Sequence, residues 1–123
     1  DSAFFNCTSL ESITIPSTVT EIGNYAFGSC SNLREVIFND GLKKIGNWAF
    51  RDCLSLKSII LPCTVTEIGE RAFEYCRNLR GVTLNDGLQK IGEAVFDNCT
   101  SLESITLPST VTEIGYSAFN NCC

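Results

Sequence analysis

Six cysteines stand 23 residues apart along the whole chain, and this fixed spacing constrains the fold more than any other feature. They are Cys7, Cys30, Cys53, Cys76, Cys99 and Cys122. A repeat of this length is typical of a solenoid, in which each repeat forms one coil that stacks on the coil before it. Each residue therefore has a column, which is its place within the coil, and a coil number along the axis.

Apolar residues occupy further columns with the same period and define a repeat unit. A phenylalanine column lies at Phe4, Phe27, Phe50, Phe73, Phe96 and Phe119. An isoleucine that is always followed by glycine lies at Ile22, Ile45, Ile68, Ile91 and Ile114. The unit reads LxxIxLPxxVxxIGxxAFxxCxx. With 44% apolar residues the chain can build one continuous core between stacked coils, so we expect a single solenoid domain of about five coils over residues 1–123.

Each repeat predicts two short extended segments and a tighter third side. Leu-x-x-Ile-x-Leu alternates at its end as a half-buried strand does, and Val-x-x-Ile-Gly is a second extended segment after a turn. Gly-x-x-Ala-Phe-x-x-Cys-x-x-Leu has spacings of three and four, which favour a helical turn or a 3₁₀ segment. Strands of successive coils should pair in parallel. The predicted fold is mostly β, with short helical or 3₁₀ turns.

The coils alternate between two types with a super-repeat of 46 residues. We call a coil odd where its first turn begins with proline, at Pro16, Pro62 and Pro108, and even where that turn reads Asn-Asp-Gly, at Asn39 and Asn85. Proline fixes φ and ends a strand, whereas Asn-Asp-Gly supplies a positive φ at the glycine. The column before each Ile-Gly alternates in charge, as Glu21, Lys44, Glu67, Lys90 and Glu113. We interpret this alternation as structural, because a slip of one coil would place like charges together.

Charge and composition exclude several classes of function. The net charge of −5 argues against nucleic acid, whose phosphates require clustered Lys and Arg. No apolar run approaches the roughly 20 residues of a membrane span, so we expect no membrane insertion. Histidine is absent, which removes the commonest general base and the commonest metal ligand. Residues 1–7 align with residues 116–122, so we expect the chain to be a segment of a longer protein or a processed or engineered product.

These residues resemble the BspA-like class of leucine-rich repeats. The resemblance covers essentially the whole chain and is carried by the IGxxAFxxCxxLxxIxLPxxV pattern. The one departure in the core is Val95, where the other repeats have alanine. The resemblance implies a leucine-rich-repeat horseshoe, a right-handed coil with a parallel sheet on its concave face. It also implies an extracellular or cell-surface protein that is used in adhesion and binding and is not an enzyme.

The cysteine column allows three interpretations. Stacked coils bring successive Cα atoms into the disulfide range of about 4.4–6.8 Å, but parallel side chains fit the required dihedral angle poorly. Zinc needs four converging ligands, and a linear ladder does not converge. We favour a packing column, in which each thiol is a small buried hydrophobe and a weak donor toward nearby carbonyls. Cys63 stands off this column where sister coils have serine, so it should be an exposed thiol that either cross-links chains or merely replaces serine.

Two columns of the first strand are candidates for a binding surface. Ile37 and Ile60 are neighbours in a column that otherwise holds threonine, and we expect both to face outward. The flanking column carries three basic residues in its middle, Arg34, Lys57 and Arg80. Small apolar patches rimmed by charge often mark partner sites. The bland alternative is that β-branched residues simply favour strands.

A further candidate is the column in which Tyr25 and Trp48 stand on successive coils, followed by Arg71. Exposed stacked aromatic residues can hold a sugar ring or anchor an interface, and they can equally cover an edge of the core. The acidic residues of variable columns are interpreted as solvating groups, namely Asp52, Glu70, Glu74, Glu93 and Asp97. Nothing in the sequence predicts a pocket that would make two of them a catalytic pair.

Two Asn-Cys-Thr sequences, at Asn6 and Asn98, match the N-glycosylation acceptor. The asparagine column precedes the buried cysteine, so both side chains should lie at the surface. We predict glycans there only if the source is a secreted eukaryotic protein, because the match means little in a bacterium.

These observations favour a non-enzymatic extracellular module for adhesion or for binding a protein or glycan ligand, with no cofactor and no metal. The alternative is a structural block that stacks end to end with copies of itself into filaments. Both ends expose an unpaired coil, which solenoids normally cap. Directly joined copies would place one odd coil on another, with Glu113 near Glu21 of the next chain.

Overall fold

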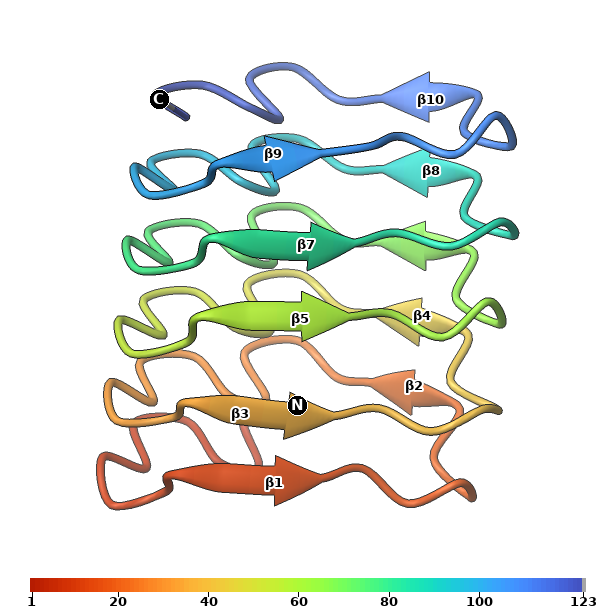
Figure 1. Cartoon of the computed structure of the whole chain (residues 1–123). Helices are drawn as coiled ribbons and strands as arrows, with labels where there is room; N and C mark the ends of the chain where they lie inside the picture. Colours follow the sequence, from red (N-terminus) through yellow and green to blue (C-terminus); the bar gives the residue numbers. More distant parts are fainter. Residues whose placement is uncertain (123) are drawn as a thin grey trace.

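The computed structural model describes residues 1–122 and shows a stack of parallel coils that rises as a right-handed spiral (Figure 1). Each coil contributes one strand to a front row and one to a back row. The front strands are β1 (Ser12–Thr14), β3 (Glu35–Ile37), β5 (Ser58–Ile60), β7 (Gly81–Thr83) and β9 (Ser104–Ile105). The back strands are β2 (Glu21–Ile22), β4 (Lys44–Ile45), β6 (Glu67–Ile68), β8 (Lys90–Ile91) and β10 (Glu113–Ile114). The predicted parallel β-solenoid is confirmed.

The register follows the sequence period, since every residue pairs with its equivalent one repeat later. The back strands form a continuous parallel sheet in the order β10-β8-β6-β4-β2. Glu21 pairs with Lys44, and Lys44 pairs with Glu67, so opposite charges face one another across neighbouring back strands. The front strands form two separate sheets, β1-β3 and β5-β7-β9.

The third side of each coil is a series of tight turns, and the predicted helical or 3₁₀ segment is wrong: residues 1–122 contain no helix. The reason is that two residues of each repeat adopt a left-handed φ of 54° to 61°, for example Tyr25 and Ser29 in the first coil. The Tyr25 and Phe27 N–H groups donate to carbonyls of the next coil, while that of Gly28 closes a turn within its own coil. Successive N–H groups therefore point alternately to the next coil and back into their own coil, so the backbone hydrogen bonds within and between coils are both made. The left-handed residues that this requires interrupt any run of helical φ and ψ values.

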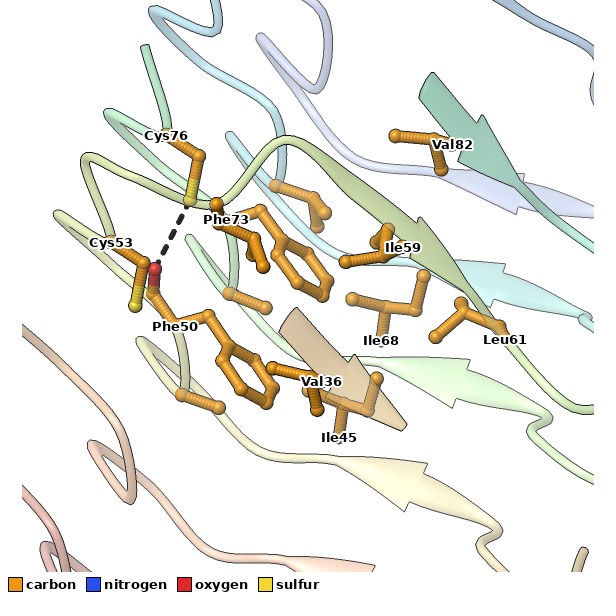
Figure 2. Close-up of a cluster of buried hydrophobic side chains, with 14 of the residues drawn as sticks. Val36, Ile45, Phe50, Cys53, Ile59, Leu61, Ile68, Phe73, Cys76 and Val82 are labelled. Atoms are coloured by element: carbon orange, nitrogen blue, oxygen red, sulfur yellow. Dashed lines mark hydrogen bonds between the residues drawn. The ribbon is translucent and has the colours of Figure 1, made fainter. Parts of the chain in front are cut away.

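The core is a set of buried columns that runs the length of the stack. Phe27, Phe50, Phe73 and Phe96 are stacked nearly parallel, with centroids 5.2–5.6 Å apart. Figure 2 shows how Ile59, Ile68 and Leu61 fill the space between Phe73 and the strands. Offset stacking and apolar burial therefore repeat from coil to coil, which makes stability approximately a sum over neighbouring coils.

The cysteine column belongs to this core, as the sequence predicts. Free thiols are found at Cys7, Cys30, Cys53, Cys63, Cys76 and Cys99. The Sγ atom of Cys76 donates to the carbonyl oxygen of Phe50 at 3.2 Å (Figure 2), and Cys53 and Cys99 make the same contact to Phe27 and Phe73. Burial raises the pKa of the Cys76 thiol well above its usual value, so this column is inert packing material.

Candidate binding surfaces

The middle of the front face carries two exposed isoleucines. The Ile37 side chain on β3 is 46% exposed and that of Ile60 on β5 is 66% exposed, which confirms their predicted outward orientation. Strands alternate their side chains, so the residues that precede them, Val36 and Ile59, are buried in the core. The chain therefore places two β-branched apolar side chains side by side in solvent, on neighbouring front strands.

A strip of positive charge flanks these isoleucines. Arg34, Lys57 and Arg80 are all exposed and precede β3, β5 and β7, one in each of three successive coils. Arg34 forms a long ion pair of 3.9 Å with Glu11, whereas Lys57 and Arg80 have no ion-pair partner among residues 1–122. The strip is a local excess of positive charge on a chain whose net charge is −5.

The isoleucine pair lies at an interruption of the front sheet. Within residues 1–122 no backbone hydrogen bond joins β3 to β5, although the back strands of the same two coils are paired. The resulting opening has a volume of about 280 Å³ and is lined by Glu35, Val36, Ile37, Phe38, Ser58 and Ile60. Phe38 is the largest side chain in a column that otherwise holds Ile or Leu, and it packs edge-on against Phe50 at 5.9 Å. We attribute the opening to this bulk, which keeps the coils apart on the front side only.

The Tyr25–Trp48 pair lies away from this patch, directly after the back strands β2 and β4. The two rings are stacked with centroids 5.0 Å apart and an interplanar angle of 3°, so each ring covers one face of the other. Phe5 meets Tyr25 edge-on at 6.0 Å. A sugar ring that stacks on an aromatic side chain needs an open ring face. One face of each ring is covered by the other and both residues are only partly exposed, so the geometry favours packing between coils.

Arg71, the next residue of that column, is occupied by carboxylates. Its guanidinium lies 3.7–3.8 Å from Glu70, Glu74 and Glu93. The interpretation of Glu74 as a solvating acid is wrong, because the residue is only 6% exposed and its carboxylate lies 2.7 Å from Arg51 Nε. A buried carboxylate needs such partners, since burial disfavours the charged form. The available signal was the 23-residue spacing that puts Arg51 and Glu74 in one column of adjacent coils.

Three other predicted residues lie apart from both surfaces. Cys63 is exposed in the turn after β5, as predicted. Asn6 is exposed and Asn98 is partly exposed, both with a left-handed φ of 60°. The Asn98 Oδ1 atom accepts a hydrogen bond from Asn121 Nδ2 at 3.1 Å. The structure therefore brings together the isoleucines and the basic strip, and it leaves the aromatic pair, the thiol and the sequons as separate features.

The repeats match a known family over the whole chain. Six copies of the BspA type leucine-rich repeat region match residues 1–123. The chain therefore belongs to the BspA-type leucine-rich repeat family. None of the curated proteins compared with it matches.

Solved structures similar to this chain are bacterial leucine-rich repeat proteins. The pneumococcal vaccine antigen PcpA is 34% identical with a TM-score of 0.83, and the match covers 91% of this chain and 28% of PcpA. A leucine-rich repeat protein from Bacteroides ovatus is 33% identical with a TM-score of 0.71, over 97% of this chain and 37% of that one. A leucine-rich cell surface protein from Faecalibacterium prausnitzii is 34% identical with a TM-score of 0.65, over 92% of this chain and 37% of that protein. This chain thus spans about a third of the length of these relatives.

The described residues hold neither a metal-binding cluster nor a membrane-spanning helix. No group of three His, Cys, Asp or Glu side chains is arranged to hold a metal ion within residues 1–122. The same residues contain no helix long and apolar enough to span a bilayer.

Proposed function

We propose that this chain is a non-enzymatic recognition module displayed outside the cell, and that its front face binds a protein. The observation that supports the proposal is the coincidence of Ile37, Ile60 and a basic strip at the interruption of the front sheet. Interfaces combine apolar contacts at their centre with a charged rim, and this patch has that composition. Similar solved structures are those of a pneumococcal vaccine antigen and of a cell surface protein, which supports an extracellular setting.

The test uses the full chain, immobilised and probed with an array of extracellular protein ectodomains. The double variant Ile37→Ser/Ile60→Ser should lose at least tenfold in affinity for every ectodomain that the wild type binds, because the apolar centre of the contact is removed. Tyr116→Ser is the matched control, since Tyr116 is 84% exposed and lies outside the patch. Unchanged affinity in the double variant, with circular dichroism showing an intact fold, would contradict the proposal.

The basic strip supplies a second arm of the same test. Exchanging Lys57 and Arg80 for glutamate should slow association and weaken its dependence on ionic strength, because long-range attraction to an acidic partner is removed. If a partner binds the glutamate variant and the wild type with equal rates at low and at physiological salt, the basic strip has no role in recognition.

Glycan binding is tested separately at the aromatic column. Wild type, Tyr25→Ala and Trp48→Ala are compared on a glycan array. Because one face of each ring is covered by the other and both residues are only partly exposed, we expect no glycan signal that depends on either residue. A signal that is lost in both variants, in proteins of wild-type fold, would transfer the proposal from the front face to this column.

A second candidate function is a structural block that stacks end to end into filaments. Its support is that the end coils expose large apolar side chains, including Phe4 at one end and Ile114 at the other. Size-exclusion chromatography and electron microscopy of the chain, with and without reductant, decide this question. Filaments would support the structural role, and their loss both on reduction and in a Cys63→Ser variant would assign the contact to Cys63. A strict monomer at high concentration would contradict it.

A further inference from the structure

The front face is hollowed along the stacked strands β5, β7 and β9 (Figure 1). One hollow, of about 280 Å³, is the opening between β3 and β5, and a second, of about 180 Å³, lies beside β7 and β9. Between them stands Gly81, where an added Cβ atom would meet nothing closer than Ser58 Cβ at 3.9 Å. The neighbours of Gly81 in its column also have short side chains. We call this strip of Ser58, Gly81 and Ser104 the front trough.

The two sides of the front trough differ in chemistry. On one side the side chains of Lys57 and Arg80 are exposed and have no ion-pair partner among residues 1–122. On the other side stands the exposed Ile60, and Thr83 follows it in the next coil with its methyl group. A molecule in the trough therefore meets positive charge on one side and an aliphatic surface on the other.

The spacing of these columns suits an extended chain. Lys57 and Ile60 are three residues apart, which places their Cα atoms roughly 10 Å from one another at about 3.3 Å per residue. An extended segment turns successive side chains to opposite sides. If such a segment runs along the solenoid axis, one set of its side chains faces Lys57 and Arg80, and the alternate set faces Ile60 and Thr83.

Acidic residues limit the positive side of the trough in both directions. Glu35 stands in the trough column on β3, and Glu103 follows Arg80 in the basic column. Both are exposed, and neither has an ion-pair partner within the described part of the chain. A carboxylate is repelled by both and attracted at Lys57 and Arg80, which lie on neighbouring coils about 4.8 Å apart. The trough therefore favours a short acidic stretch over a long polyanion.

We propose that the front trough binds an extended protein segment in which acidic and aliphatic side chains alternate. The acidic side chains face Lys57 and Arg80, and the aliphatic side chains face Ile60. The inference rests on the proposed function, because it uses Ile60 and part of the basic strip, and it adds the chemistry of the partner and a role for Gly81. A sulfated polysaccharide shares the negative charge but offers no aliphatic side chains to Ile60. The occupant is therefore a peptide segment.

Fluorescence anisotropy of labelled hexapeptides, titrated with the full chain, tests the chemistry of the occupant. The first peptide is Val-Glu-Val-Glu-Val-Glu, and the second has the same composition in the order Val-Val-Val-Glu-Glu-Glu. The third has glutamine in place of each glutamate of the first. The alternating acidic peptide should bind about tenfold more tightly than either of the others, because it alone satisfies both sides of the trough.

Dextran sulfate is the polyanion probe in the same titration. At physiological salt it should displace the alternating peptide poorly, because Glu35 and Glu103 restrict its charge contacts. Equal affinity for the two glutamate isomers, or no binding of the alternating peptide, would overturn the inference. Efficient displacement by dextran sulfate would also overturn it and would assign the basic strip to polyanions.

Two variants test the position of the occupant. Gly81→Val fills the centre of the trough and should weaken binding of the alternating peptide by about tenfold or more. The open surface at Gly81 accommodates the new side chain, so circular dichroism should be unchanged. Ser12→Val is the matched control with wild-type affinity, since Ser12 lies in the same column on β1 and outside the trough. Lys57→Gln/Arg80→Gln should abolish the preference for glutamate over glutamine in the peptide.

Wild-type affinity in Gly81→Val, or an unchanged preference for glutamate in the glutamine double variant, would refute binding in the trough. The proposed function is decided separately, by the Ile37→Ser/Ile60→Ser variant on folded ectodomains. An ectodomain that loses affinity in that variant and not in Gly81→Val would retain the front-face proposal and reject the extended acidic segment.

Discussion

The front and back sheets are built from the same repeats, yet only the back sheet is continuous. The back sheet places an identical isoleucine in each strand and a glycine directly after it, in all five coils. The equivalent front column varies, as Ile15, Phe38, Leu61, Leu84 and Leu107, and the sheet is interrupted beside its largest member. The comparison teaches that coil spacing is set on the back, where the backbones of neighbouring coils leave no room for a side chain. It is relaxed on the front, where an opening of about 280 Å³ lies between β3 and β5.

Two glycines, one on each sheet, test this difference, and we expect their substitution to give the largest difference in stability. A Cβ atom on Gly69, after the back strand β6, would lie 2.7 Å from the backbone nitrogen of Asn47. On Gly81, in the front strand β7, the nearest atom would be the Ser58 Cβ at 3.9 Å. Gly69→Ala should therefore lower the free energy of unfolding by roughly 2–3 kcal/mol, because the coils must separate. Gly81→Ala should stay within about 0.5 kcal/mol of wild type.

Urea denaturation of both variants measures this pair. Neither glycine has a positive φ, so strain in the left-handed region does not enter the comparison. Equal losses at the two positions would show that the front and back sheets constrain coil spacing alike, and the explanation given for the interruption would fail.

The cysteine column lies on the third side of the coil and, unlike the front sheet, is closed to solvent. Burial raises the pKa of Cys99 to about 12 and that of Cys76 well above its usual value, both measured from 9.0. Thiols with a raised pKa in the folded state stabilise the fold fully below pH 9, and that contribution is lost as the pH rises toward about 12. We expect stability to fall in this window, and Cys76→Ala to reduce the slope by one proton, or about 1.4 kcal/mol per pH unit.

Cys63→Ala is the control for removing a thiol as such, because Cys63 is exposed and lies outside the core. Alkylation at pH 8 with mass-spectrometric mapping gives a second readout. Cys63 should be modified in the native protein, whereas Cys53, Cys76 and Cys99 should react only after unfolding. Modification of Cys76 at a rate similar to that of Cys63 in the folded chain would refute the closed core on this side.

Replacing a lysine by glutamate on each sheet compares the two sheets again, with a smaller expected change in the free energy of unfolding. Lys44→Glu places a third carboxylate between Glu21 and Glu67 on the back sheet and should cost about 0.5–1 kcal/mol. Lys57→Glu on the front places a carboxylate between two arginines and should be neutral or slightly stabilising. Chemical denaturation at low and high salt distinguishes the two, because the Lys44→Glu loss should shrink as salt screens the repulsion. A salt-independent loss would point to packing and not to charge.

The smallest expected effect concerns the interruption itself. Phe38→Leu removes the bulk that we hold responsible for separating β3 from β5, at a cost in burial of about 1 kcal/mol or less. Amide exchange should slow at Lys57 and Ser58, the residues that would pair with β3, while Gly81 and Val82 serve as unchanged references. Faster exchange at Lys57 and Ser58 in the variant would show that Phe38 holds the two coils together.

The 23-residue pattern correctly predicted which residues stack on one another in successive coils. It did not predict the backbone conformation within a coil. Spacings of three and four residues suggested a helix on the third side, but Tyr25 and Ser29 adopt a left-handed φ so that their N–H groups can reach the next coil. A period cannot show this, because turns and helices can share the same spacing of apolar residues. Glu74 was also missed: the 23-residue spacing places Arg51 in its column, but that spacing does not show that Arg71 also approaches Glu74 or that its carboxylate is buried.

The sequence by itself determined the solenoid, its register, the buried cysteine column and the alternation of odd and even coils. These follow from a repeat of fixed length, which assigns each residue a column before any coordinates are known. Only the tertiary structure decided which candidate residues form a surface together. It placed Ile37 and Ile60 beside the basic strip, covered the faces of Tyr25 and Trp48 with each other, and neutralised Arg71 with three carboxylates. The reason is that a column records position along the coil, whereas exposure and charge pairing depend on how neighbouring coils actually pack.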